Sequence, residues 1–374
     1  MYYFVTLNEE CNLKCQYCYG KWVEDLGTTL TGYDIDYSIP INLSYDMLTL
    51  KEFCKRDPES RLIFYGGEPT LSLEKIREIM DTVPAKEYMI HTNGLLLDRL
   101  EPEYTNKFTT ILVSIDGDEE LTDRLRSRGT HQKIIQNLKT IQENGYQGEV
   151  VARMTVTQET DIEKQVRWLL FNNEHPFQSI HWQLDALFWK NDFHPRKFKE
   201  WADNSYNPGV NRLAKSWVDF MNRSHKVLRI YPFVGPTQSL LLNEETKLRC
   251  GAGWISFNIQ TDGNITPCPA MVGMKDYYLG NIVDTDISRL KDSIKVSKPC
   301  INCNVYLLCG GRCLYANLTK LWGEEGFSLV CETVMNLLDT LRRHTPRIKD
   351  LISKGVVALD DFRYPQYNSC EIIP

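Results

Sequence analysis

In the first half of the chain, short apolar runs alternate with segments in which apolar residues recur every three or four positions. The short runs predict strands, and the segments between them predict amphipathic helices. Such alternation is typical of a parallel sheet with helical crossovers, and six units are fewer than the eight that close a barrel. We therefore predict an α/β fold built on a partial, TIM-like (β/α)6 barrel with a laterally open sheet. Its strands are expected at Tyr2–Leu7, Arg61–Tyr65, Glu87–Thr92, Thr110–Asp116, Glu149–Thr157 and Ser179–Leu184.

Polar residues mark where two of the helices should begin. Ser44 is expected to cap a helix that runs through Phe53. The sequence Thr160-Asp161-Ile162-Glu163 has the pattern of a capping box, in which the first and last side chains bind each other's backbone N–H groups. It predicts a helix through Leu170.

The pattern changes in the second half of the chain. Helices are expected at Pro208–Arg223 and Glu332–Ile352, and a β-hairpin is expected around the turn Asp262-Gly263. Tyr231–Pro236 is expected to mark a domain boundary. We divide the chain into a barrel with bridging helices (1–235), a small cysteine-rich domain with the hairpin (236–335), and a C-terminal helix and tail (336–374).

Two segments have two interpretations each. Trp22–Asn42 is rich in Gly, Thr, Tyr and Asp and is too long for an ordinary connection, so it either contacts substrate or is merely mobile. Aromatic residues are dense between Trp182 and Phe233. A packed core of bridging helices is the expectation there, and the wall of a peptide-binding cleft is the alternative.

Charge and hydropathy exclude several classes of partner. The net charge of -6 provides no basic surplus for nucleic-acid binding. No stretch of about 18 uncharged apolar residues is present, so no membrane span is expected. The N-terminus lacks the pattern of a secretory signal, and we expect a cytoplasmic protein. The first strand begins at once, so recognition of a substrate's leader is expected from the barrel's own surfaces or from a separate protein.

The chain has twelve cysteines, and ten of them fall into two groups. Disulfides are disfavoured, because a chain of this size needs none and shows no export signal. Cys54 is expected to be structural, within a helix core. Metal or iron–sulfur ligation in a reducing cytoplasm is the better explanation for the groups, which are Cys11, Cys15 and Cys18, and then Cys250, Cys268, Cys300, Cys303, Cys309, Cys313 and Cys331.

The first group has C-x3-C-x2-C spacing and directly follows the first strand. Three thiolates can hold an iron–sulfur cluster with one iron left open, or a zinc ion completed by a distant histidine. Motifs after the next three strands help to decide between them. They lie at the carboxyl ends of the strands, where ligand sites of parallel α/β sheets form. They are Gly66-Gly67-Glu68-Pro69, Thr92-Asn93-Gly94 and Ser114-Ile115-Asp116-Gly117.

With these motifs, the chain resembles the radical S-adenosylmethionine (SAM) superfamily, whose hallmark is C-x3-C-x-aromatic-C after the first strand. Tyr17 is the aromatic residue here. The resemblance implies that Cys11, Cys15 and Cys18 bind a [4Fe–4S] cluster whose fourth iron binds SAM. One-electron cleavage of SAM would then give methionine and a 5′-deoxyadenosyl radical that abstracts hydrogen from substrate.

The resemblance also implies roles for residues at the strand ends. Gly66, Gly67 and Glu68 would contact the methionine amino group of SAM, and Ser114 its ribose or carboxylate. Arg126 resembles an arginine that binds the carboxylate, and Arg153 is a second candidate. For either arginine, a surface or ion-pair role is the alternative. Asp185 is expected to be a solvated or ion-paired carboxylate, and no catalytic base is assigned.

The second cysteine group is similar to the SPASM extension of radical SAM enzymes that act on peptides and proteins, with a zinc ribbon as the alternative. The resemblance implies two auxiliary clusters, and so three [4Fe–4S] clusters in all. Cys300, Cys303, Cys309 and Cys331 would hold the second auxiliary cluster, and Cys250, Cys268 and Cys313 the first. Fully ligated relatives carry one more upstream cysteine. The missing ligand could be Cys370, water or another side chain, or a substrate thiolate.

This resemblance covers nearly the whole chain and implies an anaerobic oxidoreductase that matures a ribosomally made peptide. Thioether formation is our first expectation because one cluster is open, a carbon–carbon cross-link is second, and sulfatase-type formylglycine formation is third. A zinc-binding adaptor without catalysis is the alternative from another class. The expected partners are a peptide or protein substrate, a flavodoxin- or ferredoxin-like electron donor, and possible help from a leader-recognition protein.

Overall fold

A computed structural model describes residues 1–19, 29–367 and 373–374. Its centre is a nine-stranded sheet in the order β7-β6-β5-β4-β3-β2-β1-β8-β9. Neighbouring strands from β7 to β8 run parallel, and β9 pairs antiparallel with β8. The strands are β1 (Tyr2–Thr6), β2 (Arg61–Tyr65), β3 (Glu87–Thr92), β4 (Phe108–Ser114), β5 (Glu149–Val156), β6 (Ser179–Leu184), β7 (Arg229–Ile230), β8 (Ser256–Ile259) and β9 (Ile265–Thr266).

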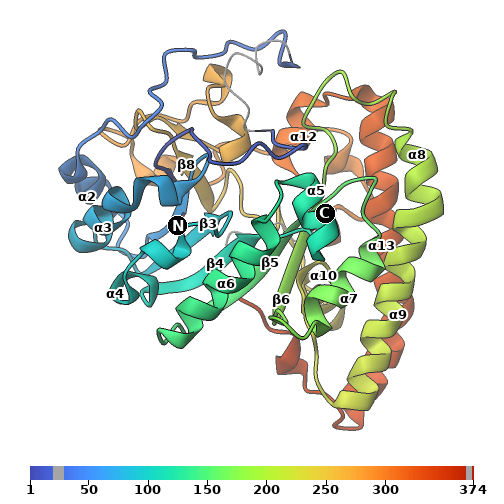
Figure 1. Ribbon diagram of the computed structural model, residues 1–374. Helices are drawn as coiled ribbons and strands as arrows, with labels where there is room; N and C mark the ends of the chain where they lie inside the picture. Colours follow the sequence, from blue (N-terminus) through green and yellow to red (C-terminus); the bar gives the residue numbers. More distant parts are fainter. Residues whose placement is uncertain (20–28, 368–372) are drawn as a thin grey trace.

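Helices connect and cover the strands (Figure 1). The strands are largely apolar because parallel sheets are buried on both faces, and every residue of β6 is buried. The long helices α9 and α13 pack side by side. The helices are α2 (Met47–Lys55), α3 (Leu73–Thr82), α4 (Pro102–Thr105), α5 (Glu119–Leu125), α6 (Thr130–Glu143), α7 (Ile162–Phe171), α8 (Phe198–Trp201), α9 (Asn207–Ser224), α10 (Tyr231–Leu242), α11 (Tyr306–Cys309), α12 (Leu314–Thr319) and α13 (Gly323–Ser353).

The six expected strands and the open sheet are confirmed, and the sheet extends further than predicted. Strand β8, from the cysteine-rich segment, pairs in parallel with β1. The predicted hairpin is β8–β9. A buried polar chain joins the three strands: Thr6 Oγ1 donates to Asn258 Oδ1 at 2.9 Å, and Asn258 Nδ2 donates to Thr266 Oγ1 at 3.2 Å. The cysteine-rich segment therefore shares the sheet of the barrel.

Two predicted helix caps were wrong by one or two residues. Asp46 caps α2 in place of Ser44, and Asp161 caps α7 in place of Thr160. Each Asp accepts a hydrogen bond from the backbone N–H three residues on, at 2.7 Å and 3.0 Å. Asp caps as well as Ser and better than Thr, and its carboxylate also suits the positive end of the helix dipole.

Helix boundaries in the second half also differ from expectation. Tyr231–Leu242 is one helix, with Pro236 inside it, across the position where the sequence suggested a boundary. Helix α13 begins at Gly323, well before Glu332. The division of the chain at residues 235 and 335 stays a prediction.

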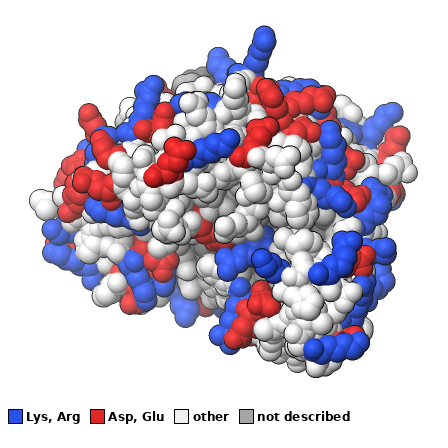
Figure 2. Space-filling view, turned by 60° about the horizontal axis from the view of Figure 1, so that its bottom comes forward, with Lys and Arg blue, Asp and Glu red and all other residues white. Residues whose placement is uncertain are grey.

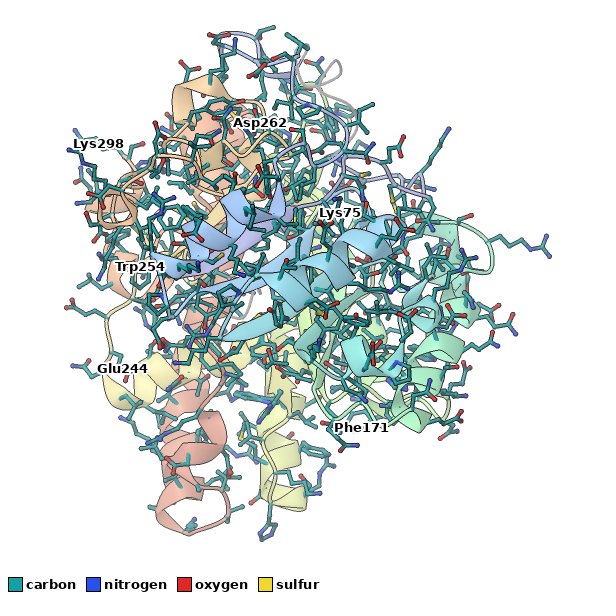
Figure 3. The ribbon with its side chains drawn as sticks, turned by 90° about the vertical axis from the view of Figure 1, so that its left-hand side faces the viewer. Lys75, Phe171, Glu244, Trp254, Asp262 and Lys298 are labelled. Atoms are coloured by element: carbon teal, nitrogen blue, oxygen red, sulfur yellow. The ribbon has the colours of Figure 1, made fainter. Side chains whose placement is uncertain are left out.

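The surface and the cysteine-rich side can be followed in the figures. Basic and acidic side chains are interspersed on the face shown in Figure 2. In Figure 3, Lys298 and Trp254 lie at the left of the view and Asp262 lies near the top. Phe171, at the end of α7, lies in the lower part of the view, right of centre. Within the described part of the chain, no helix is both long and apolar enough to cross a bilayer.

The chain Thr6–Asn258–Thr266 generates a stability prediction. Asn258→Leu leaves two buried hydroxyl groups without their amide partner, and each buried polar group left unsatisfied costs about 1–3 kcal/mol. We expect a clearly lower Tm in anaerobic thermal denaturation. The control is Thr109→Val, because the exposed Thr109 donates to a strand carbonyl and should shift the Tm little. Equal Tm values for wild type and Asn258→Leu would contradict the prediction.

Candidate functional site

A cavity of about 590 Å³ opens at the carboxyl ends of the strands of the barrel. The structure brings together there all ten residues that the sequence assigned to the first cluster and to SAM. They come from the cysteine loop, from the ends of β2 and β4, from within β5, and from the end of α5. These lining residues are Cys11, Cys15, Tyr17, Cys18, Gly66, Gly67, Glu68, Ser114, Arg126 and Arg153.

Gly66 and Gly67 allow the turn after β2 to lie directly against the chain that enters the cysteine loop. Gly67 N donates to Asn8 O at 2.9 Å, and Glu68 N donates to Glu10 O at 2.7 Å. A Cβ atom on Gly66 would lie 2.3 Å from Asn8 O, and one on Gly67 would lie 2.2 Å from Glu10 O. No side chain fits at either position. The two glycines therefore set the path of the residues just before Cys11.

The Glu68 carboxylate is buried and bound by the protein. Its Oε1 accepts hydrogen bonds from the backbone N–H of Thr70 at 3.0 Å and from Thr92 Oγ1 at 2.7 Å, and its Oε2 accepts from Asn93 N at 2.6 Å. Burial raises the pKa of Glu68, and these donors oppose the rise. Oε2 accepts from this one donor and can accept another, so both this oxygen and the main chain of the turn could contact the SAM amino group. That contact stays a prediction.

A second buried network joins the cysteine loop to β4 and β5. The Tyr17 hydroxyl donates to Asp116 at 2.7 Å, and Arg126 donates to both oxygens of Asp116 at 2.7 and 2.9 Å. Asp116 also accepts from the backbone N–H of Thr155 at 2.9 Å. The guanidinium of Arg126 lies over the Tyr17 ring. Tyr17 thus fastens the loop that carries Cys15 and Cys18 to the sheet edge.

Arg126 and Arg153 differ in how they bind other residues of the protein. Arg126 binds a carboxylate through two nitrogen atoms, whereas Arg153 donates to the side-chain oxygen of Gln183. Burial acts to lower the pKa of Arg126, but Asp116, Tyr17 and Cys15 together outweigh it, and the pKa is raised. Because Nε and Nη2 bind Asp116, a contact of Arg126 with the SAM carboxylate would use Nη1. Arg153 lies opposite Ser114 in the β4–β5 register, and its Nη2 donates to Gln183 at 2.8 Å. Both arginines line the cavity, and their roles toward SAM stay predictions.

Stacked aromatic rings form one wall of the cavity. The hydroxyl groups of Tyr19 and Tyr65 lie 2.6 Å apart. Tyr19 stacks on Phe188 with ring centroids 4.8 Å apart, and Phe188 stacks on Tyr315 at 5.8 Å. This wall runs from the cysteine loop to the cysteine-rich segment.

The aromatic stretch between Trp182 and Phe233 is mostly core, as expected. Trp182, Trp217 and Phe233 are buried against one another, with centroid distances to Phe233 of 5.7 and 5.5 Å. Phe188 is different, because it lines the cavity. Phe188 lies where the cleft-wall alternative would place it, and peptide binding there stays a prediction.

The described part of the long insertion also reaches the cavity. Tyr37, Ile39 and Ile41 line it. The segment is fixed to the cysteine-rich side, because Asp36 N donates to Gly273 O at 2.7 Å. These contacts favour the substrate-contacting interpretation for residues 29–42. Residues 22–28 lie outside the described residues.

Four cysteines of the second group lie close to one another. Burial, followed by the neighbouring thiols of Cys331, Cys309 and Cys303, raises the pKa of Cys300 to about 12. The four residues predicted to hold the second auxiliary cluster therefore interact with one another.

Two of the three cysteines predicted for the first auxiliary cluster, Cys268 and Cys313, lie near one tyrosine, and Cys250 lies near another, so this ligand set stays a prediction. Burial raises the pKa of Tyr315, and the thiols of both Cys313 and Cys268 add to that rise. Cys250 acts in the same way on Tyr367, whose pKa is raised mainly by burial. Cys370 lies outside the described residues.

These donor sets fit iron–sulfur clusters. No disulfide joins any of the eleven described cysteines. In the described ranges, no three His, Cys, Asp or Glu side chains form a group compact enough for one metal ion. In a [4Fe–4S] cluster each thiolate binds a different iron, so the sulfur atoms lie farther apart than around a single ion. The residues that would hold the clusters are those named above.

Two further expectations are confirmed. Asp185 is ion-paired with Arg196 at 2.6 Å. Burial raises the pKa of Asp185, and Arg196 opposes the rise. Cys54 is buried in the core beside α3, as expected for a structural residue.

Sequence reasoning gave no role to several residues of the site. Asn93 and Asp116 lay within motifs that were recognised, so their position after a strand could have pointed to them. Phe188 and Tyr315 belong to no motif. Only the fold brings them to the cavity.

Two families match the chain. Residues 5–167 match the Radical SAM superfamily, and residues 250–310 match SPASM, an iron-sulfur cluster-binding domain.

Curated relatives are distant. A probable GTP 3′,8-cyclase of Methanocella arvoryzae is 25% identical over 138 residues, 36% of this chain and 41% of the relative. The chain spans about two fifths of the length of the first two curated relatives that it matches. The radical SAM cyclopropyl synthase TigE of Paramaledivibacter caminithermalis is 21% identical over 344 residues, 86% of this chain and 69% of the relative.

Solved structures share the fold. The protein anSMEcpe, solved with AdoMet and the Cp18Cys peptide, superposes with a TM-score of 0.70 at 19% identity, covering 94% of this chain and 99% of its own. Streptococcus suis SuiB bound to precursor peptide SuiA gives a TM-score of 0.54 at 15% identity, covering 84% and 72%. These similarities bear out the partial barrel followed by an SPASM domain.

The Tyr17–Asp116–Arg126 network generates a prediction. Asp116→Asn leaves Arg126 buried without its counter-charge, and breaking a buried pair in this way typically costs about 3–5 kcal/mol. We expect a lower Tm and less iron per chain, because the cysteine loop loses its anchor. Asp98→Asn is the matched control, because its pair with Lys133 is partly exposed and should contribute at most about 1 kcal/mol. Wild-type iron content and Tm in Asp116→Asn would contradict this role.

Proposed function

We propose that this chain, which matches the Radical SAM superfamily over residues 5–167 and SPASM over residues 250–310, is an enzyme that modifies a ribosomally made peptide. The proposal includes three [4Fe–4S] clusters, one that binds SAM and two auxiliary ones. A flavodoxin- or ferredoxin-like protein would supply electrons, and a separate protein could assist leader recognition.

One observation carries this proposal: a single cavity is walled by both cysteine-bearing parts of the chain. The Cys11–Cys18 loop forms one side, and Pro269, Ala270 and Tyr315 contribute to the other. Pro269 directly follows Cys268, a predicted ligand of the first auxiliary cluster. A substrate side chain in this cavity would lie between the two cluster sites.

The shape of the cavity supports a peptide as the substrate. Its volume of about 590 Å³ is in the range of pockets that hold small molecules, so only part of a longer chain would enter. Tyr37 and Ile41 line it and are 60% and 43% exposed, which provides apolar contacts at its mouth. The related structures of anSMEcpe and SuiB hold peptides, which is the same class of ligand.

The chemistry divides between the cofactors and the chain. When bound, the first cluster and SAM supply a one-electron reagent that removes a hydrogen atom from the substrate. The chain holds Cys11 and Cys15 through the turn at Glu68 and the network at Asp116. Its aromatic wall, from Tyr19 to Tyr315, excludes water from the place where a substrate radical would form.

A thioether is the bond that we propose. The carbon–hydrogen bond loses its hydrogen atom, the thiol loses its proton to solvent, and a carbon–sulfur bond forms. One electron must then leave the product, and the auxiliary clusters would receive it. A substrate thiolate would complete the ligands Cys250, Cys268 and Cys313.

The C-terminal tail is the competing source of a fourth ligand. Cys370 itself lies outside the described residues. On one side of it, the Tyr367 ring packs on Trp254, and Tyr367 interacts with Cys250. On the other side, Arg312 Nε donates to Pro374 O at 2.8 Å, next to Cys313. The described residues on both sides of Cys370 therefore lie near residues next to the predicted ligands, and the role of Cys370 must be tested directly.

A carbon–carbon cross-link is the second candidate outcome. Similarity to a cyclopropyl synthase over 86% of the chain favours it. Mass spectrometry of a co-expressed precursor peptide separates the two. Both remove the mass of two hydrogen atoms, but only a thioether protects the substrate's cysteine from alkylation.

Reconstitution under anaerobic conditions tests the enzyme proposal. We expect about twelve irons per chain, four for each of three clusters, and formation of 5′-deoxyadenosine from SAM with dithionite. The variant with Cys11, Cys15 and Cys18 all changed to Ala should retain about eight irons and form no 5′-deoxyadenosine. A colourless protein that binds zinc and does not cleave SAM would establish the adaptor alternative and overturn the proposal.

The thioether proposal makes a separate prediction. Cys370→Ala should leave iron content and cluster spectra unchanged, because a substrate thiolate is proposed to complete the first auxiliary cluster. Cys54→Ala is the matched control, because Cys54 is a buried core residue away from both cysteine groups. Loss of about four irons in Cys370→Ala alone would identify the tail as the ligand and remove the basis for the thioether.

A further inference from the structure

The side chain of Asn93, at the end of β3, points its amide nitrogen toward the cysteine loop. Its Oδ1 accepts a hydrogen bond from Leu95 N at 3.0 Å, which fixes the orientation of the amide. The Nδ2 therefore faces the loop, where it donates to Asn12 Oδ1 at 2.6 Å and to Cys11 Sγ at 3.9 Å. An amide nitrogen has two hydrogens, so it can serve both acceptors.

The backbone of Asn93 is held firmly. Its N–H donates to Glu68 Oε2 at 2.6 Å, and the preceding Thr92 hydroxyl donates to Glu68 Oε1 at 2.7 Å. Gly94 O accepts from Asn137 Nδ2 at 2.8 Å. Asn93 is only 6% exposed. The amide is thus set in place before any cofactor binds.

The thiol of Cys11 receives a second donor from its own loop. Leu13 N donates to Cys11 Sγ at 3.4 Å. This bond belongs to the main chain and exists for any side chain at position 13. The bond from Asn93 is the one that a substitution can remove.

We infer that Asn93 is a positioning residue for the radical SAM cluster, which tunes its reduction potential by a hydrogen bond to the thiolate of Cys11. The inference rests on the proposed function in one respect, that Cys11 is a cluster ligand. Reduction adds negative charge to a cluster, and a donor to a ligand sulfur stabilises that charge. The potential is therefore higher with Asn93 than without it.

Asn93 also connects Glu68 to the cysteine loop, because it binds both. Glu68 binds Glu10 through its main chain and Asn93 through its side chain. The loop is consequently held on both sides of Cys11 by one buried residue. The positive charge of Arg126 acts at the other end of the loop, near Cys15.

A redox titration followed by EPR tests the inference on the anaerobically reconstituted full chain. The signal of the first cluster is identified by its loss in the variant with Cys11, Cys15 and Cys18 all changed to Ala. We expect Asn93→Ala to shift the midpoint potential of that signal to more negative values while iron content is retained. Asn93→Asp keeps the shape and the bond from Leu95, but it removes the donor and adds negative charge, so its shift should be larger.

The matched control is Asn137→Ala, which weakens the support of the same loop at Gly94 without removing a donor to Cys11. Its midpoint potential should equal that of wild type. If Asn93→Ala fails to assemble the first cluster, Asn93→Leu, which has a similar volume and neither a donor nor a charge, decides.

Two results would overturn the inference: wild-type potential in the Asn93 variant that retains the cluster, or an equal shift in Asn137→Ala. Absence of a cluster signal in the wild-type protein would instead contradict the proposed function, so the two failures are distinguishable.

Discussion

The buried carboxylate of Glu68 is the interaction on which the candidate site depends. Burial of a charge is costly unless hydrogen bonds replace water, and Glu68 receives them from the turns after β2 and β3. Its main chain binds the segment that enters the cysteine loop, at a distance that only glycine allows at positions 66 and 67. These hydrogen bonds hold the ends of β1, β2 and β3 together. The position of the cysteine loop depends on them.

The shared sheet also fixes the position of the segment that carries the second group of cysteines. Strand β8 pairs with β1, so the cysteine-rich segment is fixed to the strand that leads into the first cysteine loop. The aromatic stack from Tyr19 through Phe188 to Tyr315 spans the space between them. The cavity therefore has walls from both parts of the chain, as the proposed reaction between two clusters requires.

Much of this arrangement could be predicted from the sequence, because strand order follows from the alternating pattern and strand ends share one edge. Gly66, Glu68 and the cysteine loop were recognisable for that reason. The pairing of Asp116 with Arg126 was not, since it depends on where helix α5, which follows β4, ends. The placement of β8 beside β1, and of Phe188 in the wall, depends on contacts between distant segments that no local pattern encodes. The two predictions of helix caps were wrong because several neighbouring polar side chains could each occupy the N-cap position.

The most direct test of the account is whether SAM binds the open iron of the first cluster. EPR and ENDOR spectra of the reduced, reconstituted protein, recorded with and without SAM labelled at its amino nitrogen, measure this contact. The account predicts a changed cluster signal and a hyperfine coupling to the labelled nitrogen, both absent when Cys11, Cys15 and Cys18 are replaced by Ala. A protein with its full complement of iron whose spectra are identical with and without SAM would contradict it.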